Sequence, residues 1–335
     1  MRLLIFLAAM AFAVAQPEPV IVDTDCAIFN DDGAALAMVL QAPDQVTVLG
    51  VTLVPGNYWP SEGAGYMFRV IDALQQPGIP LHFGARVPLV HTREMAEQEK
   101  KQWGPIGYMG AFAADQPEPK PKIEHRASHK NAVDYLTDTI LSEPGPVTIL
   151  ELGPMTNLAI ALRLHPEIAA KIKRLIFMGG AVHARGSDGR AAEFNFWFDP
   201  EAASIVLRSA IPQKIMFGLD ICNRAPLDKS HYDQIVEKKT PITTLYREDI
   251  GKRFKKNPEA KFLVWDCLAA AYLVDPSWVT KKETDYLDVQ TAFGKDYGDV
   301  IPLDRALSPG ATPVEVMLDL DFQKFFEIYK NLLTK

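Results

Sequence analysis

The sequence predicts an α/β protein with a doubly wound, mainly parallel sheet flanked by helices. Short apolar runs rich in β-branched residues alternate along the chain with longer segments that have the apolar density of helices. This alternation is typical of a parallel sheet covered by helices on both faces. No repeat or low-complexity linker interrupts residues 16–335, so we expect a single domain there.

The overall composition limits the classes of partner that the protein can bind. With 335 residues, 48% of them hydrophobic, the chain can bury a large core. A net charge of −7 argues against a surface that binds nucleic acid or anionic membrane. The three cysteines are too few for a disulfide framework.

The first 15 residues differ from the rest. Arg2 precedes an apolar run that ends in Ala13-Val14-Ala15, the pattern of a signal-peptidase site. The run is too short, and too close to Gln16, to span a bilayer. We therefore expect a secretory signal peptide over residues 1–15. The domain from residue 16 onward is then exported to the periplasm or the medium and does not bind the membrane.

Four carboxylates surround the turn between the first predicted strand, residues 20–22, and the first predicted helix, residues 33–40. They are Asp23, Asp25, Asp31 and Asp32. No Lys or Arg lies within residues 20–40, so close carboxylates would repel one another unless a cation neutralised them. Oxygen-only ligands favour Ca²⁺ or Mg²⁺ over Zn²⁺. This stretch predicts a metal site or a phosphoryl-type site.

The remaining elements follow the same alternation. Further strands are predicted at residues 47–54, 147–150, 174–177 and 214–217. Helices are predicted at residues 61–74 (capped by Ser61), 131–141, 155–164, 200–209 and 322–333, and over most of residues 228–274 with a break at 247–261. Residues 82–116 lose periodicity and predict a long functional loop or lid.

Polar residues stand at several predicted turns. Asn57 follows a strand and a Pro-Gly turn. Glu193 and Asn195 alternate with Phe194 and Phe196 on a segment that we expect to be extended, which would point both polar side chains to one side.

The order of these motifs resembles the inosine-uridine nucleoside hydrolase family over essentially the whole chain from Pro19. The motifs are DTD and NDD within residues 23–32, PGN at 55–57, LGPMTNLAIAL at 152–162, FMGG at 177–180, AEFNFWFDP at 192–200 and WDCLAAAYLVDP at 265–276. The resemblance implies hydrolysis of the N-glycosidic bond of ribonucleosides by Ca²⁺-activated water. It also leads us to expect a homo-oligomer, a dimer or a tetramer.

The family pattern implies a role for each matching residue. The Ca²⁺ ligands would be Asp25, Asp32, Asp266 and the backbone carbonyl of Leu152. Asp25 would also take the proton of the attacking water, with Asp23 as support behind it. The ribose contacts would be Asp31, Asn57, Met178, Glu193, Asn195 and Asp266.

The sequence departs from the family pattern at informative places. The turn from Asp25 to Asp31 is two residues longer than the common one. Ser187 aligns with an Asn that usually contacts ribose, which leaves Asp188 as a substitute. Trp265 stands where broad-specificity members have a His as leaving-group acid, so it resembles the purine-specific branch, in which an indole stacks on the base. Trp103 is the candidate for the other face of the base.

Two alternatives stay open at this point. A haloacid-dehalogenase-like phosphatase would use Asp23 as nucleophile with Mg²⁺, but the later motifs would then have no explanation. A non-catalytic nucleoside-binding or Ca²⁺-binding protein of the same fold would keep the acidic residues without turnover.

Overall fold

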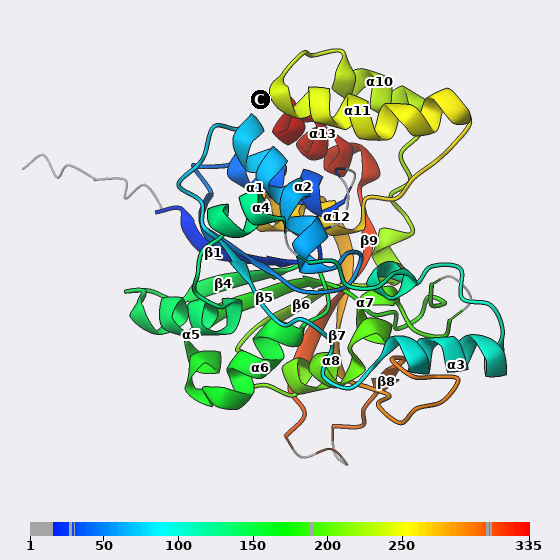
Figure 1. The fold of residues 1–335 in the computed structure, drawn as a ribbon. Coiled ribbons are helices and arrows are strands. Elements are labelled where there is room, and N and C mark those ends of the chain that lie inside the picture. Colours follow the sequence, from blue (N-terminus) through cyan, green and yellow to red (C-terminus); the bar gives the residue numbers. More distant parts are fainter. Residues whose placement is uncertain are drawn as a thin grey trace, which may run out of the picture.

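The computed structural model describes residues 16–26, 29, 31–118, 120–187, 190–305, 308 and 310–335. Within them a nine-stranded sheet, in the order β3-β2-β1-β4-β5-β6-β9-β7-β8, runs through the molecule with helices on both faces (Figure 1). The strands are β1 (Glu18–Thr24), β2 (Val46–Leu53), β3 (Leu81–Phe83), β4 (Val147–Glu151), β5 (Ile172–Met178), β6 (Lys214–Phe217), β7 (Val279–Val289), β8 (Val300–Pro302) and β9 (Pro313–Leu320).

Most of the sheet is parallel, as predicted. Neighbours from β3 to β9 pair in parallel, and β7 pairs antiparallel with both β9 and β8. The chain runs outward from β1 to β2 and β3, then returns to β4 on the other side of β1. Such a reversal opens a crevice at the carboxyl ends of the two central strands.

The helices form a layer on each side of the sheet (Figure 1). One layer holds α1 (Asp32–Leu40), α2 (Pro60–Ala73), α4 (Pro121–Arg126), α10 (Lys229–Val236), α11 (Pro241–Lys256), α12 (Trp265–Val274) and α13 (Phe322–Leu333). The other holds α5 (Ala132–Ser142), α6 (Thr156–Leu164) and α8 (Pro200–Leu207). The shorter helices are α7 (Phe194–Phe198) and α9 (Leu219–Cys222), with 3₁₀ turns at Pro166–Lys171 and Pro276–Trp278.

The first strand shows how one run feeds both layers. Val20 and Val22 enter the core under α1 and α12, and Ile21 enters the core under α5 and α6. Alternate side chains of a strand point to opposite faces, so a strand buried on both sides reads as a continuous apolar run. None of the helices in the described part of the chain is long and apolar enough to cross a membrane.

Two predicted helix limits are wrong. The helix α2 begins at Pro60 after Trp59, and Ser61 lies inside its first turn, where its hydroxyl donates to the Pro117 carbonyl. Pro at the first helical position explains this start, because its missing N–H would be unpaired there anyway. The predicted break over residues 247–261 is also wrong at its beginning, since α11 continues to Lys256.

The region predicted to be one irregular loop, residues 82–116, contains regular structure. It holds the end of β3, the helix α3 (Arg93–Trp103) and the 3₁₀ turn η1 (Gly110–Ala113). The sequence of α3 is highly polar and holds few apolar residues, so its apolar face is narrow. Both ends of α3 nevertheless carry the residues typical of helix ends. The Thr92 hydroxyl accepts a hydrogen bond from the Met95 N–H, and lysines occupy the last turn.

The segment predicted to be extended is the helix α7. The Glu193 side chain accepts hydrogen bonds from the N–H groups of Asn195 and Phe196, which caps the first turn. All five residues of α7 are buried, four of them aromatic, so burial on every side hides the helical period.

Candidate active site

Four of the predicted site residues lie at the carboxyl ends of the central strands. Those that follow or end β1, β2, β4 and β5 are Asp25, Asn57, Leu152 and Met178. The helices α1 and α12 pack against each other over this edge, and each carries an aspartate in its first turn. The reversal of the chain at β1 therefore brings residues from six elements to one edge of the sheet.

Asp25 is fully buried and held by the turn after β2. The Asn57 backbone N–H donates to its Oδ2 at 2.7 Å, and the Asn57 Nδ2 donates to its Oδ1 at 3.0 Å. An added Cβ at Gly56 would lie 2.1 Å from Oδ2, so the turn can approach this closely only as glycine. Both carboxylate oxygens are thus fixed by a neighbouring strand end.

Three further aspartates meet beside Asp25. One carboxylate oxygen from each of Asp31, Asp32 and Asp266 lies within 4.8 Å of the others, and all three residues are buried. The Asp266 N–H donates to Asp31 Oδ1 at 2.9 Å, across 235 positions of sequence. The Thr24 hydroxyl donates to Asp32 Oδ1.

The electrostatics of this group are unfavourable without a cation. Burial, and then the charge of Asp32, raises the pKa of Asp25. Burial, followed by the charges of Asp31, Asp32 and Asp25, raises the pKa of Asp266 well above its ordinary value. Asp266 Oδ2 is buried without a hydrogen-bond partner among the described residues. Oxygen atoms at this spacing suit a hard divalent ion.

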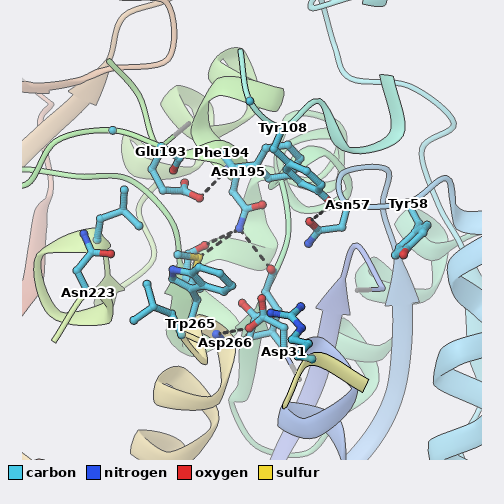
Figure 2. Close-up of a pocket in the computed structure, with 18 residues that line it drawn as sticks. Asp31, Asn57, Tyr58, Tyr108, Glu193, Phe194, Asn195, Asn223, Trp265 and Asp266 are labelled. Atoms are coloured by element: carbon cyan, nitrogen blue, oxygen red, sulfur yellow. Dashed lines mark hydrogen bonds between the residues drawn. The ribbon is translucent and has the colours of Figure 1, made fainter. Parts of the chain in front are cut away.

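A cavity of about 620 Å³ opens above these carboxylates. Asp31 and Asp266 lie at its floor, while Trp265 forms one side and Tyr108 and Phe194 form another (Figure 2). Leu152 also lines the cavity. Polar groups at the bottom and aromatic rings at the sides suit a ligand with a hydroxylated half and a flat half.

Comparison with known proteins finds relatives that are similar over nearly the whole length of the chain. The family model for inosine-uridine preferring nucleoside hydrolases matches residues 20–327. The chain is 32% identical over 321 residues to the pyrimidine-specific ribonucleoside hydrolase RihA of Salmonella paratyphi B, covering 94% of this chain and 98% of that protein.

The chain belongs to the nucleoside hydrolase family. Solved structures show the same fold. An inosine-guanosine nucleoside hydrolase superposes with a TM-score of 0.79 at 23% identity, covering 94% of this chain and 98% of that one. A purine-preferring ribonucleoside hydrolase from Gardnerella vaginalis gives a TM-score of 0.72 at 23% identity, covering 95% and 98%.

Membership decides between the alternatives raised by the sequence. The protein is an N-ribosyl hydrolase of a metal-dependent family, so the phosphatase alternative is wrong and the acidic residues do not belong to a mere binding protein. The predicted doubly wound fold is confirmed.

Two of the predicted metal ligands of this nucleoside hydrolase, Asp32 and Asp266, belong to the close group of carboxylates. Asp25 is not a member of that group but lies near enough to interact electrostatically with both. The Leu152 carbonyl accepts from Asn195 Nδ2 at 3.3 Å and therefore faces the cavity floor. Asp31, predicted as a ribose contact, lies within the same group.

The predicted sugar-side residues also line the cavity. Asn195 Nδ2 donates to the Met178 carbonyl at 3.1 Å, while Asn195 Oδ1 is buried without a partner among the described residues. Glu193 lines the cavity, and its carboxylate accepts from the Gly180 N–H at 2.8 Å besides capping α7. Glu193 therefore caps α7 and lines the cavity at the same time.

Asp23, predicted as a supporting residue, is not among the residues that line the cavity. It is fully buried and accepts from Asn157 Nδ2 at 3.0 Å. Burial raises its pKa to about 7. Ser187 lines the cavity, whereas Asp188 is outside the described residues.

The prediction for Trp103 is wrong. It ends α3, is 39% exposed and packs against Phe293 with ring centroids 5.5 Å apart, away from the cavity lining. The aromatic rings opposite Trp265 are those of Tyr108 and Phe194.

Sequence reasoning missed several lining residues. They are Tyr58, Tyr108, Phe194, Asn223 and Arg253. Arg253 sits in a basic run that reads as a solvated helix face, and only the packing of α11 brings it to the cavity. For Tyr108, the signal was an aromatic residue between Gly107 and Gly110, since glycines let a loop bend close to a ligand.

Proposed function

We propose that this protein is a Ca²⁺-dependent ribonucleoside hydrolase that prefers purine nucleosides, acts after export, and releases free base and ribose. The meeting of Asp31, Asp32 and Asp266 at the floor of a cavity walled by aromatic rings carries the proposal. Carboxylates at the floor can accept hydrogen bonds from the sugar hydroxyls, and aromatic walls can stack on the base.

The donor set fits Ca²⁺. Asp25, Asp32, Asp266 and the Leu152 carbonyl would hold the ion, because all offer hard oxygen atoms and Asp266 Oδ2 has no partner among the described residues. When bound, Ca²⁺ lowers the pKa of a water molecule. It also neutralises carboxylates whose pKa values burial raises, so they remain charged at neutral pH.

Asp25 serves as the general base. Its two hydrogen bonds from Asn57 favour the ionised carboxylate and fix its direction. It accepts the proton of the attacking water while the bond between C1′ and the base breaks. The remaining carboxylates stabilise the positive charge that develops on the sugar ring.

The ribose is held by groups already in place. Asn195 Oδ1 is an unpartnered buried acceptor in the described structure, which suits a sugar hydroxyl. Asp31, Asn57, Met178 and Glu193 line the same part of the cavity. Rigid contacts to the hydroxyl groups orient C1′ toward the water, so a 2′-deoxynucleoside should be a poor substrate.

The base preference rests on Trp265. No histidine is found among the described residues that line the cavity. Stacking on the Trp265 indole would raise the proton affinity of the base, so that the leaving base takes its proton from solvent and needs no histidine acid. A purine offers more area to that indole than a pyrimidine does. The relatives carry names of both classes, pyrimidine-specific for RihA and purine-preferring for the Gardnerella enzyme, and so do not decide the preference.

A substrate panel tests these points together. Purified protein is incubated with inosine, adenosine, guanosine, uridine and cytidine, with added Ca²⁺ or with a chelator. We expect Ca²⁺-dependent release of purine bases at the higher kcat/KM. Equal kcat/KM for inosine and uridine would refute the purine preference, and full activity in chelator would refute the metal requirement.

The location and assembly are proposals from the sequence. Cleavage after Ala15 would leave Gln16 as the first residue, which N-terminal sequencing of the exported protein can detect. We expect a dimer or a tetramer, which light scattering of the eluted protein measures. An N-terminus at Met1 in protein recovered from the cytoplasm would refute export.

A further inference from the structure

A path of hydrogen bonds leads from the mouth of the cavity to Asp25. Asn57 donates to both oxygens of Asp25, which turns its amide oxygen away from that carboxylate. The Tyr108 hydroxyl donates to this amide oxygen, Asn57 Oδ1, at 2.9 Å. Figure 2 shows Tyr108 beside Asn57 on the side of the cavity that faces Trp265. The Asn57 carboxamide is therefore held at both of its ends.

Tyr108 is itself anchored on both sides. The Arg190 guanidinium donates to the Tyr108 carbonyl at 2.6 Å and lies 4.4 Å from the centre of the Trp197 ring. The Tyr108 ring packs against Phe194 with centroids 5.2 Å apart. Phe194 and Trp197 both belong to α7, the helix that also carries Asn195. The tyrosine is thus tied to the element that bears the sugar-side residues.

A second tie joins the same loop to the turn that holds Asp25. The Ala111 N–H donates to the Gly56 carbonyl at 2.8 Å. Gly110, with φ of 54°, brings its backbone so close that an added Cβ would lie 2.3 Å from that carbonyl oxygen. Residues 108–111 therefore bridge α7 and the turn after β2.

We propose that Tyr108 is a positioning residue for nucleoside hydrolysis, acting through Asn57, and that Arg190 holds it in place. This inference rests on the proposed function, in which Asn57 contacts the ribose and Asp25 takes the proton. A carboxamide bonded only to Asp25 can tilt about its side-chain torsions, whereas one bonded at both ends is preorganised. The hydroxyl of Tyr108 supplies the second bond.

Tyr108→Phe removes that hydroxyl and keeps the ring against Phe194. Loss of one hydrogen bond to a positioned group should lower kcat/KM for a ribonucleoside by about 5- to 10-fold. The unfolding midpoint should stay unchanged. Tyr286→Phe, a tyrosine on β7 outside the cavity lining, is the matched control and should leave kcat/KM unchanged.

A double-mutant cycle separates positioning from simple support of the loop. If Tyr108 acts through Asn57, Tyr108→Phe should change kcat/KM by less than about twofold in an Asn57→Ala background. Support of the loop alone would give the same factor in both backgrounds and would overturn the proposal. The cycle is also read from the Kd of a C-nucleoside, whose carbon–carbon glycosidic bond is not hydrolysed, so low turnover in Asn57→Ala does not prevent the test.

Arg190→Met tests the anchor. It should lower kcat/KM in the wild type but have no further effect in Tyr108→Phe, because the hydroxyl that it positions is then absent. Arg185→Met, an exposed arginine of the same loop, is the control.

A wild type that hydrolyses no ribonucleoside would refute the proposed function. A wild type that hydrolyses them while Tyr108→Phe matches it in both readouts would sink this inference alone.

Discussion

The protonation state of Asp25 depends on two neighbours, Asn57 and Asp32. Asn57 supplies two N–H donors that favour the ionised carboxylate, while the charge of Asp32 and complete burial favour the protonated form. A bound cation would decide this competition in favour of the carboxylate. The proposed base and the proposed metal site would therefore form one electrostatic unit.

Asp25→Ala should abolish most of the turnover. Removing a general base typically costs about 10²- to 10⁴-fold in rate, and here the same side chain is also a proposed metal ligand. We expect kcat for inosine to fall by at least about 10³-fold, measured as release of hypoxanthine. Asp44→Ala, at an exposed turn, should retain wild-type kcat. Turnover of Asp25→Ala near the wild-type rate would remove Asp25 from the mechanism.

Trp265→Ala should change the base preference more than the overall activity. Stacking on an aromatic ring is worth about 1–3 kcal/mol per base, and purines lose more of it. We expect the ratio of kcat/KM for inosine to that for uridine to fall at least about fivefold. Trp103→Ala is the matched control and should leave this ratio unchanged, because Trp103 packs on Phe293 outside the cavity lining. A change with Trp103→Ala alone would reverse our assignment of the two tryptophans.

At the scale of elements, the polar helix α3 and the buried helix α7 form a small aromatic core beside the main sheet. Trp197 of α7 donates from its indole to Glu99 of α3 at 2.8 Å. Phe112 of η1 stacks on Phe198 with centroids 4.3 Å apart. This second core packs against the loop that carries Tyr108 and so supports that wall of the cavity.

Gly110→Ala should disturb both stability and activity. An alanine at φ of 54° would place its Cβ 2.3 Å from the Gly56 carbonyl oxygen, so the loop must move away from the Asp25 turn. We expect a loss of about 2–4 kcal/mol in unfolding free energy, from the left-handed backbone and the overpacking together. Denaturant unfolding measures it. Gly78→Ala, where an added Cβ meets nothing within 4 Å, should cost much less.

At the scale of the whole molecule, buried carboxylates link pH, metal and stability. Burial raises the pKa of Asp23 to about 7, and burial also raises the pKa of Asp25 and Asp266. These three carboxyl groups thus bind protons more tightly in the folded state than in the unfolded chain. Without metal, their contribution to stability is fully present below the ordinary aspartate pKa of 3.8 and is lost as pH rises through their raised pKa values, which for Asp23 is about 7.

Ca²⁺ should reverse this trend. The metal-free protein should show a Tm that falls between pH 4 and pH 7.5. Ca²⁺ at 100 times its Kd should raise Tm at pH 7.5 by about 5 °C, and by less at pH 5, where protons compete for the same oxygen atoms. Differential scanning calorimetry with chelator and with Ca²⁺ measures both. An equal rise at both pH values would contradict a carboxylate metal site.

The sequence by itself determined the five parallel strands β1, β2, β4, β5 and β6 and the acidic turn, because each depends on residues that are close together in the chain. Apolar runs rich in β-branched residues mark strands such as β1 and β2, and four aspartates cluster in sequence from the end of β1 to the start of α1. Burial on both faces leaves such a run little choice of structure.

Only the tertiary structure decided which distant groups meet. The bond from Asp266 to Asp31 spans 235 positions, and sequence reasoning reached that pairing through family resemblance alone. Tyr108 and Arg253 reach the cavity, and Trp103 misses it, because of how α3, α7 and α11 pack on the sheet. Periodicity reports the environment of an element and its immediate neighbours, whereas the walls of a cavity depend on where whole elements settle against one another.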